Sequence, residues 1–350
     1  MESSVLSAFQ SCKPEDGCAW VKWDFSFPIF QHFAIFGPKD FYSDEDPSLV
    51  YEYPPNGNAS EYGIARFIFF DPILETQAKV SFFDSHFPNT PETLNFQSEE
   101  LLLLKSQADS PTFIYCLRFQ ATPPLRPATE DFETLKQNCY KAHVEWEKTK
   151  KLPLCRFAIC FITSHPFYNF YFSILRHIMA LEARSRTSAI NLFDPSQKSN
   201  VRSTSWPEAS FDTRTLFLDQ LYNMNLPIYG EYFSILFGNK TFTWKMPHTQ
   251  DVPQFLAQWG LSSIFPWVQL DDLLSIISAL LLEKYFIVIG RSIQEIMKAV
   301  SFLPQLIHPF TWMNPIITII PPDLFDLLDS PMANILGIRI PDDHDEEEKL

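Results

Sequence analysis

Cysteine and histidine are the residue types in this chain with the widest chemical use, and their spacing predicts structural roles. There are six cysteines and no CxxC pair, and nothing stands at zinc-ligand spacing from Cys12 and Cys18. Most of the cysteines fall in apolar or amphipathic stretches, which predicts reduced thiols in the core. The six are Cys12, Cys18, Cys116, Cys139, Cys155 and Cys160. Among the eight histidines, His165 and His308 lie beside prolines and His177 lies on a helix flank, positions typical of structural residues.

The short motifs of common enzyme classes are missing from the sequence. It contains no G-x-S-x-G, G-x-x-x-x-G-K-[ST], G-x-G-x-x-G or H-E-x-x-H motif, and only nine glycines. Ser164 and His165 are neighbours in sequence, but a catalytic dyad requires a geometry that adjacency does not provide. We therefore predict no catalytic residue, no cofactor-binding residue, no metal ligand and no covalent chemistry.

Composition predicts a globular protein. The 350 residues are 46% hydrophobic and include 34 phenylalanines, and this length suffices for two domains with sizeable cores. The formal net charge of −15 argues against a nucleic-acid surface, which needs clustered Lys and Arg. Residues Asp342 to Leu350 hold six acids and one lysine, a run typical of a solvated acidic tail.

The sequence shows neither a signal peptide nor a membrane span. Residues Met1 to Asp16 have no basic start and no apolar centre, which favours a reducing, cytoplasmic location. The most apolar window is interrupted by Glu283 and Lys284, so we expect no transmembrane segment. Peripheral association with a membrane stays open.

The C-terminal third alternates between helical and strand patterns. Leu273 to Leu282 predicts a buried helix behind the acids Asp271 and Asp272, and Tyr285 to Ile289 predicts a strand apolar on both faces. Ser292 begins a capping box for a helix that runs to about Leu303. Further predicted elements are a strand at Ile316 to Ile320 and a helix at Asp323 to Asp329. This order predicts βαβ units with a mainly parallel sheet, in which Ile287, Ile289, Ile317 and Ile319 are all buried.

The N-terminal half predicts an antiparallel sheet. Its expected strands are Phe30 to Gly37, Leu49 to Tyr53, Ile64 to Asp71 and Thr112 to Phe119. The leucine-rich stretch Thr93 to Asp109 is ambiguous, and a helix is expected from Glu130 to Trp146. We place the boundary between two sheets, and between two cores, at Leu152 and Pro153.

Beyond that boundary the pattern predicts a strand at Cys155 to Ile162 and a helix that follows Ser164. Ser185 to Ser210 lacks periodicity and is expected to be a loop or disordered. A short helix at Thr215 to Tyr222 and strands at Tyr232 to Phe237 and Thr241 to Trp244 complete the expected elements.

Three motifs in the C-terminal third occur together in a known order. They are Leu280 to Glu283, then His308-Pro309-Phe310-Thr311-Trp312, then Pro321-Pro322 through Ser330-Pro331-Met332 to Gly337. Together they resemble the central segment of the DENN family, proteins known as exchange factors for Rab GTPases. The first two strands resemble the opening of the family's upstream segment. The family continues into a downstream helical segment, and we expect this chain to lack that segment, because its sequence turns acidic at Asp342.

The resemblance implies an α/β fold of two lobes. Residues 28–151 would form an upstream, longin-like lobe with an antiparallel sheet and helices. Residues 152–341 would form a central α/β lobe with a mainly parallel sheet, and residues 342–350 an acidic tail. The implied function is guanine nucleotide exchange on a Rab GTPase in vesicle-mediated transport, in the cytoplasm or peripherally on vesicle or endosomal membranes.

The resemblance also implies how such a protein works and which alternatives compete. Exchange requires a surface, and Asp329, Pro331 and Met332 are the candidate partner-binding residues, because a methionine that follows proline at a helix end can stay exposed and adaptable. The alternative is a purely structural role, in which the Met332 side chain is buried in the core. One functional alternative is a scaffold that recruits a GTPase or a partner subunit without exchange. Another is GTPase activation through an arginine finger, for which the candidates are Arg156, Arg176, Arg214 and Arg291, each more simply explained as solvated or ion-paired.

Overall fold

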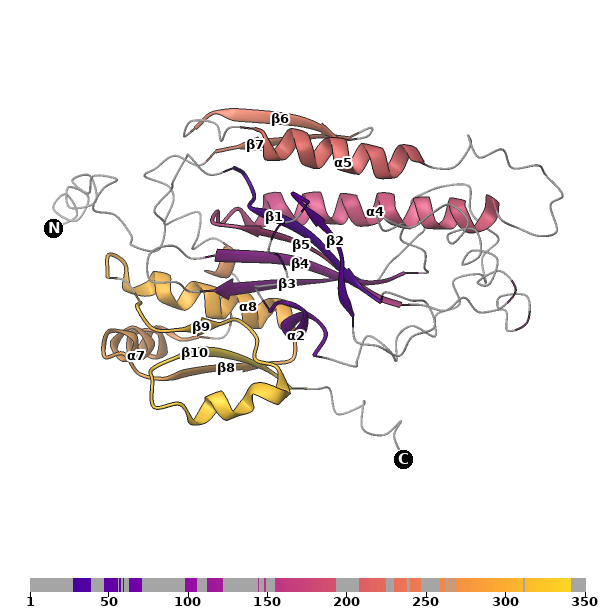
Figure 1. The fold of residues 1–350 in the computed structure, drawn as a ribbon. Helices are drawn as coiled ribbons and strands as arrows, with labels where there is room; N and C mark the ends of the chain where they lie inside the picture. The colour runs from indigo at the N-terminus through magenta and orange to yellow at the C-terminus, as the bar shows by residue number, and fades with distance from the viewer. Residues whose placement is uncertain are drawn as a thin grey trace.

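A computed structural model gives the fold of the chain (Figure 1). Apart from isolated positions, it describes residues 28–38, 47–55, 63–70, 98–105, 112–121, 155–192, 208–224, 230–237, 240–246, 259–261, 268–310 and 312–340. The helix expected from Glu130 to Trp146 lies outside the described residues except for Val144. The acidic tail lies outside them as well.

The larger of the two main sheets has five antiparallel strands in the order β2-β1-β5-β4-β3. They are β1 (His32–Gly37), β2 (Ser48–Tyr53), β3 (Ser98–Lys105), β4 (Thr112–Ala121) and β5 (Cys155–Thr163). The antiparallel N-terminal sheet is confirmed, as are the strands expected at β1, β2 and β4. β3 lies within the leucine-rich stretch that the sequence left ambiguous.

β5 is the middle strand of this sheet. It pairs with β1 on one side, where Phe33 lies opposite Phe161, and with β4 on the other, where Cys116 lies opposite Cys160. The expectation that a sheet boundary falls before β5, at Leu152 and Pro153, is therefore wrong. An apolar run fits the centre of any sheet covered on both faces, and its local pattern does not reveal which strands are its partners.

A second expectation is wrong at residues 64–71, which were expected to form a strand. They contain a one-turn helix, α2 (Ala65–Ile68), in which the amides of Phe67 and Ile68 donate to the carbonyl of Ile64 at 2.9 and 3.1 Å. Ile64 and Ile68 are both buried, and their separation by four residues is the helical period. A short continuous apolar run does not by itself distinguish helix from strand.

Helices and a hairpin form layers above one face of the large sheet (Figure 1). α4 (Tyr168–Leu192) packs on β4 and β5, and α5 (Glu208–Tyr222) packs on α4. β6 (Tyr232–Phe237) and β7 (Lys240–Lys245) pair as an antiparallel hairpin beside α5. The helix after Ser164 and both hairpin strands are confirmed, but α4 and α5 extend into the region expected to be a loop.

The C-terminal part of the chain builds a separate parallel sheet in the order β8-β10-β9. Its elements are α7 (Leu270–Leu281), β8 (Phe286–Gly290), α8 (Ile293–Phe302), the 3-10 helix η6 (Leu303–Ile307), β9 (Ile316–Ile317), the 3-10 helix η7 (Pro322–Asp329) and β10 (Ile335–Arg339). The Ser292 hydroxyl accepts from the amide of Glu295 at 3.4 Å, as the capping box predicts. The parallel sheet is confirmed, although β9 is shorter than expected.

The two main sheets meet at the edge of β3. The backbone amide of Leu102 donates to the sulfur of Met297 on α8 at 2.8 Å, and its carbonyl accepts from the hydroxyl of Thr318, directly after β9. Backbone groups on a buried strand edge need partners, and here side chains of the C-terminal part supply them. The small sheet is thereby fixed against one edge of the large one.

This joint leads to a first testable prediction. In Thr318→Val the carbonyl of Leu102 loses the buried donor that now satisfies it, so we expect the free energy of unfolding to fall by about 1–3 kcal/mol. Urea denaturation followed by circular dichroism measures the change. Thr243→Val is the matched control, because Thr243 is an exposed strand threonine whose hydroxyl pairs with Ser234 at 2.9 Å. Equal losses in the two variants would show that the joint contributes no stability.

Candidate protein-binding surface

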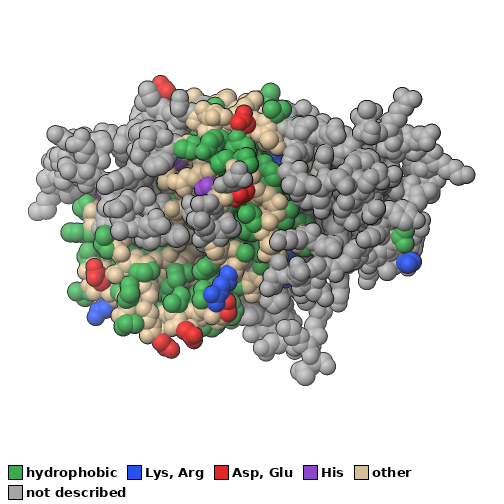
Figure 2. Space-filling view, viewed as in Figure 1, with side chains coloured by type: hydrophobic (Ala, Val, Ile, Leu, Met, Phe, Trp, Pro, Cys, Tyr) green, Lys and Arg blue, Asp and Glu red, His purple; other side chains and the backbone are tan. Residues whose placement is uncertain are grey.

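Exposed apolar side chains gather on the C-terminal part of the molecule. Among the residues that the structure describes, twelve of the sixteen exposed large hydrophobic residues lie between Leu270 and Ile340. Figure 2 shows hydrophobic side chains over the region where Figure 1 draws α7, β8 and η7. We call this region the C-terminal apolar surface and define it by Leu270, Leu274, Leu281, Leu282, Ile287, Ile289, Phe325, Leu327 and Met332. Clustered exposed apolar residues mark interaction sites in soluble proteins.

α7 and the residue after it supply four leucines of this surface. Leu270, Leu274 and Leu281 are each more than half exposed, so the expectation of a buried helix is wrong. The hydroxyls of Ser275 and Ser278 donate to carbonyls one turn earlier, at 2.9 and 2.8 Å, and are satisfied within the helix. The exposed side therefore offers few polar groups that a partner would have to desolvate. Apolar residues occur on every side of this helix, a pattern that is typical of helices covered by other parts of a protein.

β8 continues the surface. Ile287 and Ile289 are 43% and 57% exposed, which corrects the expectation that both are buried. Of the other two isoleucines, Ile319 is fully buried, as expected, and Ile317 is half-buried. Strands of parallel sheets are normally covered on both faces, and the expectation failed because, among the described residues, one face of β8 is left partly uncovered.

The three candidate residues of the sequence lie at the end of η7, beside the start of β8. Asp329, Pro331 and Met332 are all exposed, Met332 by 52%, so Met332 does not fill the core. The hydroxyl of Tyr285 donates to the carbonyl of Leu327 at 3.3 Å and joins this segment to β8. Partial burial, with the nearby charge of Asp329, raises the pKa of Tyr285, which therefore stays a neutral donor.

The charges around the surface are mostly negative. On α7, on the turn that follows it, directly after β8 and on η7, the exposed charged residues are Asp271, Asp272, Glu283, Asp323, Asp326, Asp329, Lys284 and Arg291. Asp323 is paired with Arg66 of α2. The remaining acids face solvent around an apolar centre, and this arrangement favours a partner that carries basic groups.

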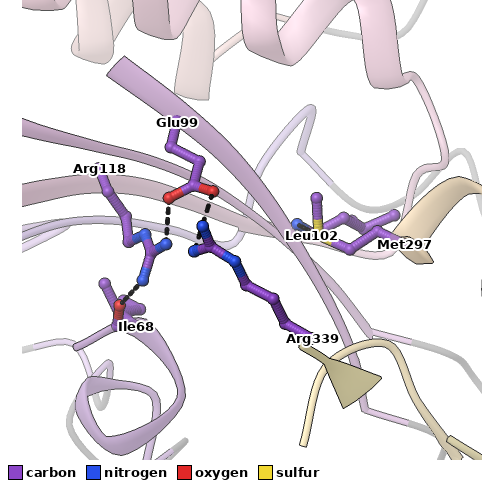
Figure 3. Close-up of polar contacts among 6 residues, drawn as sticks. All are labelled: Ile68, Glu99, Leu102, Arg118, Met297 and Arg339. Atoms are coloured by element: carbon purple, nitrogen blue, oxygen red, sulfur yellow. Dashed lines mark hydrogen bonds and ion pairs between the residues drawn. The ribbon is translucent and has the colours of Figure 1, made fainter. Parts of the chain in front are cut away.

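A buried ion-pair cluster holds the C-terminal part in place (Figure 3). Arg118 of β4 is almost fully buried, donates to the carbonyl of Ile68 at 2.7 Å and pairs with Glu99 of β3. Glu99 also lies 4.0 Å from Arg339 of β10. With the Arg66 pair to η7, these contacts tie β3, β4 and α2 to the small sheet that carries the surface.

Two cysteines and two histidines among the described residues are buried or half-buried. Cys116 and Cys160 are free and buried, and burial raises the pKa of Cys160 well above its ordinary value, so its thiol is a poor nucleophile. His165 is buried, and a ring nitrogen of His177 lies 3.3 Å from the carbonyl oxygen of Phe237. No group of three His, Cys, Asp or Glu side chains within the described ranges could hold a metal ion. Nor is any helix in these ranges long and apolar enough to cross a membrane.

Two of the four candidate arginines have well-defined contacts. Arg176 pairs with Glu100 of β3. Arg214 is buried, with its guanidinium 4.5 Å from the ring centre of Tyr51. A buried arginine stacked on a ring cannot reach a bound GTPase without local unfolding, so the geometry gives Arg214 no part in an arginine finger.

Comparisons with known proteins agree with the motifs. A sequence model described as the DENN (AEX-3) domain matches residues 154–350, more than half of the chain. A stretch of 83 residues is 30% identical to DENN domain-containing protein 2A of Mus musculus. This stretch makes up 24% of the chain and 8% of that protein. A stretch of 95 residues is 22% identical to DENN domain-containing protein 1A of Homo sapiens, and it makes up 27% of the chain and 9% of that protein. The matched stretches therefore span less than a tenth of either relative.

Proposed function

Because the chain belongs to the DENN (AEX-3) domain family, we propose that it is a guanine nucleotide exchange factor that promotes GDP release from a Rab-family small GTPase in vesicle trafficking. The match over residues 154–350 carries this proposal. The exposed C-terminal apolar surface supports it, because an exchange factor acts through a binding surface and needs no covalent chemistry.

The proposed mechanism is differential binding. A factor that binds the nucleotide-free GTPase more tightly than the GDP-bound form lowers the barrier to GDP release. A thousandfold acceleration corresponds to about 4 kcal/mol of differential affinity. We assign Asp329, Pro331 and Met332 to the contact with the GTPase, since all three are exposed at the end of η7, beside the apolar centre of the surface.

We further propose that the family's segments divide the chain as its motifs indicate. Residues 28–151 would correspond to the upstream, longin-like segment and residues 152–341 to the central segment, with β5 contributed to the upstream sheet by the central segment. We place the protein in the cytoplasm and peripherally on vesicle or endosomal membranes, where a Rab GTPase would recruit it.

The test is release of a fluorescent GDP analogue from a panel of Rab GTPases, with and without catalytic amounts of the chain. We expect at least one Rab to respond. The double variant Asp329→Lys, Met332→Asp should lower that rate by about tenfold or more, because it reverses a charge and places another in an apolar contact. Leu236→Asp is the matched control, since Leu236 is an exposed leucine on β6, outside the surface, and should leave the rate unchanged.

The same panel decides against exchange if the results differ. A Rab that binds equally well loaded and nucleotide-free, without faster GDP release, would identify the chain as a recruiting scaffold. Absence of binding to any Rab in either state would reject both functions. Equal rates for the double variant and the wild type would remove Asp329 and Met332 from the contact.

A further inference from the structure

The two faces of the small parallel sheet are covered unequally. α8 packs on β8 and β10. On these strands a β-carbon added at Gly290 or Gly337 would approach the side chain of Ile296, so these positions face α8. Side chains alternate along a strand, which directs Ile287 and Ile289 to the opposite face. Figure 1 draws η7 on that face.

The cover on this second face does not extend to β8. On β10, Leu336 is fully buried, whereas its register partner Ile287 on β8 is 43% exposed. A helix is about 10 Å across and neighbouring strands are about 4.8 Å apart, so one short helix covers about two strands of a three-stranded sheet. An apolar strip along the outer strand is therefore left open in the described part of the chain.

The shape of this strip favours a helix as its cover. The exposed atoms belong to side chains on the face of the sheet, and faces of parallel sheets are covered by helices. An added strand would pair with the edge of β8 and leave Ile287 and Ile289 in water. A helix with an apolar stripe would bury both isoleucines and would lie alongside η7, whose Phe325 and Leu327 are also exposed.

The surrounding charge indicates which kind of helix. Glu283 lies in the turn just before β8, and Asp326 and Asp329 lie on η7. The exposed bases beside β8 are Lys284 in the same turn and Arg291 directly after the strand, so the acids are in excess by one. A second copy of this chain would bring the same acids against each other, and an anionic membrane would repel them. Lysine or arginine beside an apolar stripe would complement them.

We propose that the strip formed by Ile287, Ile289 and η7 binds an amphipathic helix of a partner protein, with basic residues on both sides of its apolar stripe. This proposal goes beyond nucleotide exchange, and its test uses no GTPase.

A designed peptide tests the proposal, whatever the natural partner is. The probe is a fluorescein-labelled, 18-residue Leu/Lys peptide with its leucines on one helical face, and binding to the full chain is measured by fluorescence anisotropy. A Leu/Glu peptide of the same pattern and a scrambled Leu/Lys peptide are the comparison probes. We expect the patterned Leu/Lys peptide alone to bind, and its affinity to weaken as salt is added.

Two sets of variants locate the binding. Ile287→Ser with Ile289→Ser removes the apolar strip and should weaken the patterned Leu/Lys peptide by about tenfold or more. Leu216→Ser with Leu236→Ser is the matched control, because both leucines are 62% exposed on other elements, and should bind as the wild type does.

The second set reverses the charges. Glu283→Lys with Asp326→Lys should weaken the patterned Leu/Lys peptide and create binding of the Leu/Glu peptide, whereas the control Glu231→Lys, an exposed acid before β6, should do neither. Unchanged binding in the isoleucine variant would overturn the proposal. So would self-association of the wild type in sedimentation, or binding to vesicles with anionic lipid, if the isoleucine variant abolished it, because the occupant would then be a second copy or a membrane.

Discussion

Gly337→Ala is expected to unfold the small parallel sheet. A β-carbon at Gly337 would lie 2.0 Å from the carbonyl oxygen of Thr318 and 2.6 Å from Cγ2 of Ile296. The first clash is with the backbone of Thr318, which cannot shift easily. The amide of Ile320 donates to the carbonyl of Gly337 at 2.9 Å and holds the segment after β9 against β10. Overpacking of this kind costs about 1–3 kcal/mol when side chains can yield, and we expect at least about 3 kcal/mol here.

Urea denaturation measures the loss, and amide hydrogen exchange of residues 286–340 shows where it occurs. The matched control is Gly290→Ala on the neighbouring strand β8. There the nearest atom is Cγ1 of Ile296, at 3.1 Å, which belongs to a side chain that can shift, so we expect less than about 1 kcal/mol. A Gly337→Ala protein as stable as the Gly290→Ala protein would show that the close approach of β10 to Thr318 is not required.

Local patterns predicted the elements whose stabilising contacts are close in sequence. The capping box at Ser292, the apolar spacing of α8 and the strand β8 belong to one short segment, so their sequence contains most of the information that forms them. β1, β2 and the hairpin were predicted for the same reason. The motif that ends at Gly337 coincides with the place where only glycine fits.

The errors concern contacts between distant segments. β5 follows a predicted boundary at residue 152, yet it pairs with strands that precede that boundary, and no local property of an apolar strand specifies its partners. α2 is one turn long, too short for periodicity to identify. The exposure of α7, Ile287 and Ile289 depends on which other segments pack against them. A sequence pattern shows how hydrophobic a segment is, but it does not show what packs against it.

Of the candidate site, the sequence predicted the end of η7 and missed the larger apolar area beside it. Asp329, Pro331 and Met332 were chosen from a motif, and the structure places all three on the surface. Their role in binding a GTPase stays a prediction. α7 and β8 were assigned to the core because strongly apolar segments are usually buried.

Arg118 gave no signal in the sequence, where it stands in the apolar strand Thr112–Ala121. Its side chain is 1% exposed, and its guanidinium contacts the carbonyl of Ile68, the carboxylate of Glu99 and, at 5.4 Å, the ring of Phe70. A buried charge persists only when its partners compensate for lost hydration. The contacts made by Arg118 therefore decide how firmly α2 and β3 are held together.

Arg118→Ala is accordingly expected to lower the free energy of unfolding by about 3–5 kcal/mol, because it leaves Glu99 with the more distant Arg339 and the carbonyl of Ile68 without its donor. Arg176→Ala is the matched control, since its partner Glu100 is the neighbour of Glu99 on β3. That pair is less buried than the Arg118 pair, with side chains that are 57% exposed for Arg176 and 16% exposed for Glu100, so we expect a smaller loss, about 1–2 kcal/mol. Adding Glu99→Gln to Arg118→Ala should recover part of the loss, since the charge left behind is then removed. Urea denaturation of the four proteins, wild type included, measures each step, and equal stability of the two arginine variants would contradict a central role for Arg118.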